Sequence, residues 1–281
     1  MRNYFVIITP IISILAISVL FGCDNGANTT TICKNNPELC DDLHSDSWCR
    51  FEKADLIKKR FMLKNTAQPT GKQIYQHLIN LENYSKCIEL AAGVQHILHP
   101  ERTNDRVRAF GISAQNLAQL QDSTKESTDL YLSFYHWIRF GDLNAQARVI
   151  HAEVNNEITD PLILAHLAAY YQKSNIERAK MLYLTLLDLV APEQVNPDWL
   201  LGLASIYQQQ NDLEKTYLFS KANVLMTKNT ASDSRMSALV NGDVQLQSFL
   251  DKQAEGLVEQ LKNGDYPSSE LRQQLNHPPE K

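Results

Sequence analysis

Residues 161–190, PLILAHLAAYYQKSNIERAKMLYLTLLDLV, decide the fold of this chain. They hold two apolar-rich segments of helical length on either side of the polar turn Ser174-Asn175-Ile176. Asp160 precedes Pro161, and a capping side chain followed by proline at the first helical position is a typical helix start. The stretch therefore predicts a pair of antiparallel helices over 161–173 and 176–190.

Turns of the same form recur at Glu82-Asn83-Tyr84, Gly141-Asp142-Leu143 and Asn211-Asp212-Leu213. The apolar residues Leu143, Ile176 and Leu213 close three of the four turns, and they lie 33 and 37 positions apart. No segment shows strand alternation with hairpin turns. The sequence predicts an all-α fold with helices over 46–63, 71–82, 84–98, 103–120, 125–140, 143–155, 161–173, 176–190, 197–210, 212–226 and 243–263.

The spacing of the turns brackets the period of about 34 residues of the tetratricopeptide repeat, and residues 71–226 resemble degenerate hairpins of that family. The family places an aromatic residue six positions before the turn residue, where this chain has Trp137, Tyr170 and Tyr207. It places a small residue three positions after the turn residue, where Ala179 and Thr216 lie here. The resemblance implies an α-solenoid of antiparallel hairpins, with an irregular helical bundle as the alternative.

The resemblance also implies a concave face, built from the first helix of each hairpin, that binds a partner. A row of polar and aromatic side chains on that face suits an extended peptide, although glutamine is also common on an ordinary solvated helix face. The residues predicted to line this groove are Tyr135, Arg139, Tyr171, Gln172, Ser205, Gln208 and Gln209.

The N-terminus has the anatomy of a secretory signal peptide. Arg2 is followed by a run from Tyr4 to Leu20 that contains no charged residue. Leu20, Gly22 and Cys23 then resemble the lipobox of bacterial lipoproteins, which implies removal of residues 1–22 and a covalent diacylglycerol and acyl lipid on Cys23. An uncleaved membrane anchor is the alternative. Asp24 is similar to the residue that retains lipoproteins in the inner membrane, so we expect a lipid-anchored protein that faces the periplasm, in the inner rather than the outer membrane.

The charge balance limits the possible partners. Without residues 1–22 the chain has 26 basic and 32 acidic side chains, because Arg2 is the one charge removed. A mildly acidic protein lacks the basic face that nucleic acid requires, and it lacks a polybasic surface for membrane binding. We therefore expect no nucleic-acid partner, and we expect the lipid to provide membrane attachment.

Four cysteines remain after Cys23: Cys33, Cys40, Cys49 and Cys87. An even number in an exported chain predicts two disulfides, with three possible pairings. Free thiols or a metal site are the alternatives, but the spacings contain no pair of the zinc-knuckle type. Cys87 takes the small-residue position of the first predicted hairpin, so a cysteine on the preceding helix is its natural partner. This favours Cys33–Cys40 together with Cys49–Cys87.

The segment His44-Ser45-Asp46-Ser47-Trp48-Cys49 contains the residue types of a nucleophilic site. Adjacency in sequence does not make a triad, because a base must be aimed at the nucleophile across a fold. We expect Asp46 to cap the helix 46–63, while Thr70 and Ser123 begin capping boxes at the next helix starts. The chain has no recognisable catalytic motif and no sign of a cofactor other than the lipid or of a bound metal.

The sequence thus predicts a signal peptide over 1–22, a lipidated flexible tether over 23–32 and a cysteine-rich loop and helix over 33–70. Helical repeats over 71–226, a capping helix within 227–263 and a flexible tail over 264–281 complete the chain. The spacing Cys-x6-Cys-Asp-Asp-Leu-His-Ser-Asp-Ser-Trp-Cys ahead of helical pairs also resembles an uncharacterised family of Gram-negative envelope lipoproteins. We expect an adaptor that binds an envelope protein or peptide; an enzyme or enzyme regulator acting on cell-wall material through the cysteine-rich head is the alternative.

Overall fold

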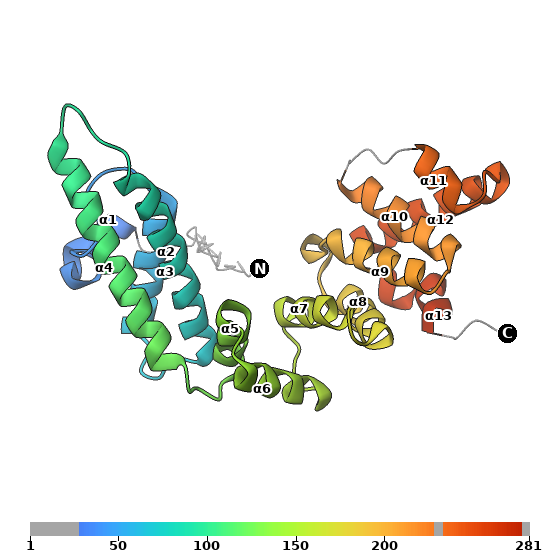
Figure 1. Ribbon diagram of the computed structural model, residues 1–281, viewed down its shortest axis with the longest axis horizontal. Coiled ribbons are helices and arrows are strands. Elements are labelled where there is room, and N and C mark those ends of the chain that lie inside the picture. The colour runs from blue at the N-terminus through green and yellow to red at the C-terminus, as the bar shows by residue number, and fades with distance from the viewer. Residues whose placement is uncertain (1–27, 228–232, 277–281) are drawn as a thin grey trace, which may run out of the picture. The chain divides into compact units, whose positions relative to one another are not determined.

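The computed structural model describes residues 28–227 and 233–276, and it is all-helical over these ranges, as predicted (Figure 1). The predicted signal peptide and residues 23–27 of the predicted tether, Cys23 among them, lie outside the described residues. The chain divides into two compact units, Met1–Asp142 and Leu143–Lys281, called unit 1 and unit 2 below. None of the described helices combines the length and apolar character needed to cross a bilayer.

Unit 1 is built around one long central helix, α3, which packs against α2, α4 and α5. Its helices are α1 (Thr29–Asn35), the 3-10 helix η1 (Pro37–Leu39), α2 (Arg50–Lys64), α3 (Gly71–Ala92), α4 (Pro100–Thr124) and α5 (Leu130–Phe140). The core of the cysteine-bearing half buries Ile32, Leu43, Cys49, Leu56, Ile57, Leu81, Tyr84, Ile88, Ala91 and Ala109.

The predicted turn at Glu82-Asn83-Tyr84 is wrong, because α3 runs through it without a break. No glycine or proline interrupts residues 72–92, and Leu81, Tyr84 and Ile88 follow each other at helical spacing on one buried face. Burial of that face favours continuing the helix. The first predicted hairpin is therefore replaced by the longer pair α3 and α4, which are joined by residues 93–99.

Helix starts follow the predicted caps only in part. Thr70 forms the predicted capping box with Gln73 at the start of α3. The predicted box at Ser123 is wrong, because α4 continues to Thr124, whose hydroxyl donates back to the Leu120 carbonyl across 2.8 Å. Asp129 caps α5 instead, since its carboxylate accepts from two backbone N–H groups of the first turn.

Unit 2 begins with helices that pack in sequence order: α7 against α8, α8 against α9 and α9 against α10. The later helix α12 then covers α10. The elements are α6 (Leu143–Val154), α7 (Pro161–Tyr171), α8 (Ile176–Leu189), η2 (Pro192–Gln194), α9 (Asp198–Gln209), α10 (Leu213–Thr227), α11 (Asp233–Leu239), α12 (Val244–Asn263), η3 (Tyr266–Ser268) and α13 (Glu270–Asn276).

Close approach of α8 to α9 depends on Gly202. A Cβ atom at this position would lie 2.5 Å from the ring of Tyr183, which real Cβ contacts do not tolerate. The Tyr183 hydroxyl accepts a hydrogen bond of 3.1 Å from Gln172 Nε2, so the C-terminal end of α7 is tied to the same contact. The missing side chain at Gly202 thus lets three successive helices meet.

Both ends of the described chain contain more structure than the sequence indicated. Residues 29–32 of the predicted tether belong to α1, where Ile32 packs into the unit 1 core. In the predicted tail, Tyr266 is buried and Arg272 forms a bidentate ion pair with Asp188 of α8, at distances from 2.6 to 2.9 Å. At both ends, contacts with distant parts of the chain stabilise short helices whose own sequences predict helix only weakly.

The two disulfides have the pairing that the sequence favours. Cys33 joins Cys40 within residues 33–49, the segment called the head below. Cys49 joins Cys87 of α3 across 38 positions. The second disulfide therefore links the segment before α2 to the central helix of unit 1.

Candidate functional site

The residues predicted to line a groove fall into three structural environments. Tyr135 is fully buried in unit 1, so it offers no surface to a partner. Its hydroxyl donates to Glu82 across 2.5 Å and accepts from Gln121 Nε2 across 2.8 Å. Arg139 is exposed, and its guanidinium pairs with the same Glu82 at 3.1 Å. In unit 1, therefore, the two predicted groove residues share one acidic partner between α3 and α5.

Tyr171 and Gln172 are half-buried and hold unit 2 together. The Tyr171 hydroxyl donates to Glu153 of α6 across 3.2 Å, and Arg178 of α8 donates to the same carboxylate across 2.6 Å. Because the Glu153 side chain is buried, this pair of donors satisfies a charge that would otherwise be costly. Gln172 is engaged at the Tyr183 and Gly202 contact described above.

Ser205, Gln208 and Gln209 differ from the other groove candidates because they are exposed on α9. Within the part of the chain that the structure describes, their side chains make no hydrogen bond or ion pair. Leu201 lies one turn before Ser205 and is also exposed. The opposite side of α9 is buried through Trp199, Leu200, Leu203, Ile206 and Tyr207. One face of α9 therefore builds the core, and the other presents amide, hydroxyl and aliphatic groups to solvent.

An open depression of about 460 Å³ lies just beyond the end of this face. It is lined by the turn between α9 and α10 and by the segment that joins α11 to α12. Its lining residues are Gln210, Asn211, Asp212, Leu213, Glu214, Leu239, Val240, Asn241 and Leu246. The surface that begins on α9 thus continues into a shallow, largely polar concavity within unit 2.

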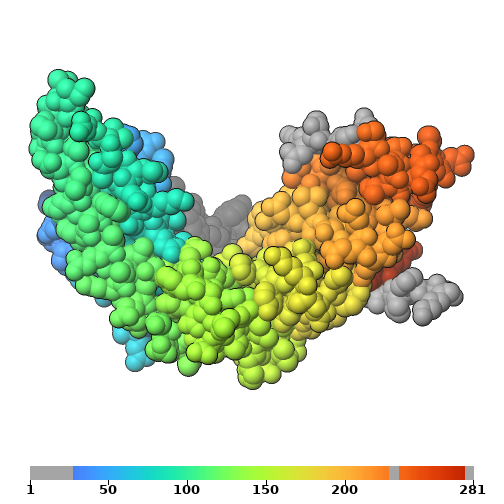
Figure 2. All heavy atoms as spheres, viewed as in Figure 1, coloured from blue at the N-terminus to red at the C-terminus, as the bar shows by residue number. Residues whose placement is uncertain are grey.

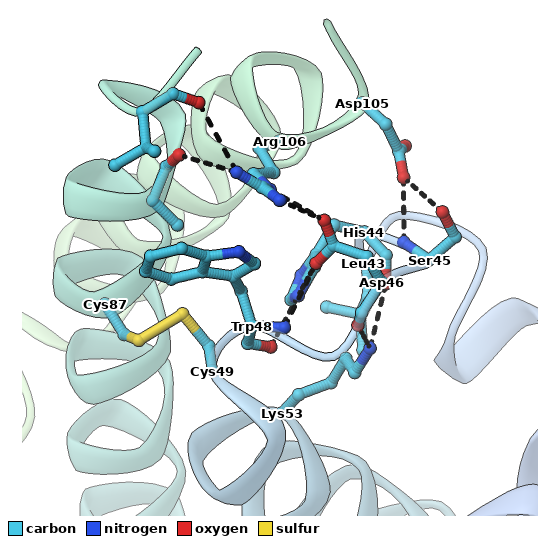
Figure 3. Close-up of polar contacts among 12 residues, drawn as sticks. Leu43, His44, Ser45, Asp46, Trp48, Cys49, Lys53, Cys87, Asp105 and Arg106 are labelled. Carbon is cyan, nitrogen blue, oxygen red and sulfur yellow. Dashed lines mark hydrogen bonds and ion pairs between the residues drawn. A yellow bond between two sulfur atoms is a disulfide. The ribbon is translucent and has the colours of Figure 1, made fainter. Parts of the chain in front are cut away.

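A dense polar cluster surrounds His44 in the cysteine-bearing head of unit 1 (Figure 3). The His44 ring is buried, and its Nε2 donates to the Trp48 carbonyl across 2.7 Å because a carbonyl can only accept. In the neutral ring Nδ1 then accepts from the Tyr84 hydroxyl across 2.9 Å. The oxygen of Tyr84 in turn accepts from the His44 backbone N–H at 3.3 Å. Both ring nitrogens of His44 are therefore already hydrogen-bonded within the protein.

Asp46 does not cap α2, as the sequence predicted, but binds Arg106 of α4. Its Oδ2 accepts from Nε and Nη2 of Arg106 at 2.7 and 2.5 Å. The guanidinium is also stacked over the Trp48 ring at 4.9 Å and donates to the carbonyls of Ala91 and Val94 (Figure 3). α2 instead begins at Arg50, after Cys49 in a left-handed conformation. Arg106 thus joins the head, α3 and α4 at one point.

A second set of contacts continues from Ser45 to α4. The Ser45 hydroxyl and backbone N–H donate to Asp105 across 2.9 and 2.7 Å. Arg108 donates to the same carboxylate and to the Leu43 carbonyl. The Ser45 hydroxyl is therefore bound to an acceptor on α4, and its partners do not include the ring of His44. The serine and histidine that the sequence placed side by side are not arranged as a nucleophile and its base.

The environment of the cluster shifts its titrating groups. Burial lowers the pKa of His44, with a further contribution from the charge of Lys53. Burial disfavours the charged form of Asp46, but hydrogen bonds from Arg106 and the Trp48 N–H outweigh it and lower the pKa of Asp46. Burial raises the pKa of Tyr84 to about 12. The cluster therefore holds a neutral histidine and an ionised aspartate, each in contact with its fixed partners.

Cys49, Glu52 and Cys87 lie close enough together to bind one metal ion. Both sulfur atoms are joined in the disulfide, so only the Glu52 carboxylate keeps its ligand capacity in the oxidised protein. An open depression of about 400 Å³ covers this disulfide, between the exposed rings of Trp48 and Phe51. The Cys49–Cys87 disulfide forms the floor of this depression, and His44 is not among the residues that line it.

Sequence reasoning did not find Arg106, Tyr84 or Asp105 as partners of the head. These residues lie 40 or 60 positions from their partners, and nothing in the local sequence marks them. The one available signal was the high density of polar residue types between His44 and Ser47.

The chain matches a protein-family model over residues 20–221, from the end of the predicted signal peptide into α10. The family is described as Protein of unknown function (DUF2989). No curated protein and no solved structure matches the chain. Because the match covers well over half of the sequence, the chain belongs to the DUF2989 family of proteins of unknown function.

Proposed function

We propose that this protein is a lipid-anchored adaptor of the cell envelope, in which tetratricopeptide-like hairpins bind an envelope protein or peptide. The observation that carries the proposal is the solvent face of α9. There Ser205, Gln208 and Gln209 are exposed and have no partner among the described residues, while the groove candidates on α5 and α7 are engaged in internal contacts.

The packing of unit 2 supports this function. Helices α7 to α10 pack in sequence order, as the units of a helical repeat do, and repeats of this kind use exposed helix faces to bind partners. Amide and hydroxyl side chains can hydrogen-bond the backbone of an extended segment, and Leu201 adds an apolar contact. The depression beyond Gln210 offers space for a side chain of the same partner.

The predicted lipid supports the proposed location. With Cys23 acylated, the folded chain faces the periplasm from the inner membrane. The solvent face of α9 is then accessible to proteins of that compartment. The acidic charge balance and the predicted export argue against nucleic acid as the partner.

The test is site-specific photo-crosslinking in cells that express the full chain. A photoreactive phenylalanine analogue at Ser205 or Gln208 is expected to give a discrete adduct with an envelope protein. The same analogue at Glu255, an exposed position on α12, serves as the matched control. Replacing both Gln208 and Gln209 with alanine is expected to remove the adduct formed from position 205 while the thermal melt stays within a few degrees of the wild type. Equal adducts from positions 205, 208 and 255, or none at all, would contradict the assignment of this face.

A further inference from the structure

The loop between α3 and α4 presents apolar side chains to solvent at the apex of unit 1. Ile97 is 93% exposed and Leu98 is 82% exposed, and these are the two most exposed large apolar residues among those described. Leu90 and Val94, on the last turn of α3 and just after it, are 71% and 44% exposed. Isolated exposed apolar residues are common, but four within nine positions form a patch of the kind that marks an interaction surface.

The apex stands clear of the other helices of unit 1 (Figure 1, Figure 2). α3 and α4 are the longest helices of the unit, and the loop over 93–99 lies at their common end. A projecting apex cannot enclose an extended peptide as a groove does. A projecting apolar loop can instead insert into the surface of a lipid bilayer.

Hydrogen bonds hold the loop in this conformation. The His96 N–H donates to Thr103 Oγ1 across 2.9 Å, and the His99 N–H donates to His96 Nδ1 across 3.0 Å. Arg106 donates to the carbonyl groups of Ala91 and Val94 at the loop's N-terminal side. These contacts come from within the loop and from α4, so Ile97 and Leu98 point outward from a supported loop.

The groups beside the apolar tip suit the interfacial region of a bilayer. His96, His99 and Arg102 flank Ile97 and Leu98, and His99 contacts Glu101 at 3.1 Å. The guanidinium of Arg102 can bind phosphate groups at the interface, while the aliphatic side chains enter the region of the acyl chains.

The chain length between the predicted lipid and the fold keeps unit 1 close to the membrane. Cys23 is five residues before Asn28, the N-cap of α1, and five Cα steps span at most about 18 Å. Ile32 of α1 belongs to the same core cluster as Ala91, at the end of α3 that leads into the loop. α1, where the described chain begins, therefore packs into the same core as the end of α3 that leads into the loop.

We infer that Ile97 and Leu98 form a second membrane contact, inserting into the lipid surface beside the acyl anchor. This contact orients unit 1 on the bilayer, whereas a lipid on a short linker alone leaves its orientation free. The inference rests on the proposed membrane location, but it assigns an affinity for lipid to the folded chain itself. That affinity can be measured without acylation.

The experiment uses the chain from Asp24 onward, which has no lipid and contains every described residue. Cosedimentation with vesicles of phosphatidylethanolamine and phosphatidylglycerol is expected to recover the wild-type chain in the pellet. Replacing Ile97 and Leu98 with serine is expected to lower the partition coefficient about a hundredfold, since two apolar side chains no longer leave water. Val154→Ser with Leu162→Ser is the matched control, because these side chains are 63% and 53% exposed in unit 2. That control is expected to bind as the wild type does.

Blue-shifted fluorescence on addition of vesicles to an Ile97→Trp variant provides a second measurement, because it reports entry of this side chain into an apolar phase. Vesicle binding that is equal in the wild type and in the serine double variant of the apex would overturn the inference. A wild-type chain that stays in the supernatant would overturn it as well. Neither result would affect the predicted acylation of Cys23, which is tested by processing of the precursor, or the α9 face, which is tested by crosslinking.

Discussion

Tyr84 completes the hydrogen bonds of His44 from forty positions away in the chain. Its hydroxyl donates to Nδ1 of His44 across 2.9 Å and accepts from the His44 backbone N–H at 3.3 Å. The disulfide between Cys49 and Cys87 lies on the same two segments, so the head is attached to α3 by both a covalent and a polar link. This relationship makes the head part of the folded unit.

Tyr84→Phe is expected to lower the free energy of unfolding by about 1–3 kcal/mol, because it leaves two buried polar groups of His44 without a partner. Urea denaturation at neutral pH measures the change. Tyr266→Phe is the matched control, since the buried Tyr266 hydroxyl has no hydrogen-bond partner among the described residues. Its removal is expected to leave stability unchanged or higher. Equal losses in the two variants would show that the hydroxyl of Tyr84 contributes nothing specific.

Stability is expected to fall as the pH drops through the window between about 6.5 and 4, because of His77. Burial, followed by the charges of Arg60 and Lys59, lowers the pKa of His77 to about 4. In the unfolded chain a histidine binds its proton near pH 6.5, so below that pH the unfolded state takes up a proton that the folded state does not. The full stability is present above the unfolded pKa, and about 3 kcal/mol is lost by pH 4.

Urea denaturation across that pH range, with wild type and His77→Gln compared, measures this dependence. The variant is expected to show a flatter profile. His151→Gln, which replaces an exposed histidine of α6, should keep the wild-type slope. A His77→Gln profile parallel to that of the wild type would assign the acid sensitivity to other groups, among them His44.

Removing the Cys49–Cys87 disulfide with paired serines is expected to cost more stability than removing Cys33–Cys40. The two bonds close segments of 38 and 7 positions, and loop-closure entropy gives about 4 and about 2 kcal/mol for these lengths. Guanidinium unfolding of the two double variants, each with the other disulfide intact, gives the order. The opposite order would mean that native-state packing of the head, and not loop entropy, dominates.

Gly202→Ala is expected to destabilise unit 2 by about 1–3 kcal/mol, because its Cβ would meet the Tyr183 ring at 2.5 Å. Gly111→Ala on the exposed side of α4 meets nothing within 4 Å and is expected to stabilise by about 0.5–1 kcal/mol through its helix propensity. Thermal melts of the two variants are the measurement. If Gly202→Ala raised the melting temperature as Gly111→Ala should, the close contact of α8 and α9 would not be required.

Cys23→Ala is expected to abolish acylation and leave the precursor uncleaved by the lipoprotein-specific signal peptidase. Metabolic labelling with a fatty acid and the electrophoretic mobility of the precursor report the two effects. Ser18→Ala, within the predicted signal peptide, is the matched control and should be processed normally. Normal processing and labelling of the Cys23 variant would contradict the lipobox assignment.

The sequence by itself determined the helical class and most helix positions of unit 2. These features depend on local signals: apolar residues at helical spacing, Asp160 before Pro161, and polar turns such as the one at Asn175. A local pattern is sufficient there because cap and apolar face both lie within the segment they specify.

Tertiary structure alone decided where α3 ends, which groove candidates stay exposed and how the head is held. Tyr84 continues α3 through a predicted turn because the core buries it, and Tyr135 is lost from the surface because α3 and α4 supply its partners. Asp46 leaves its expected cap for Arg106, sixty positions away. Each outcome depends on a charge or a buried surface that distant segments contribute only after folding, so no local pattern could indicate it.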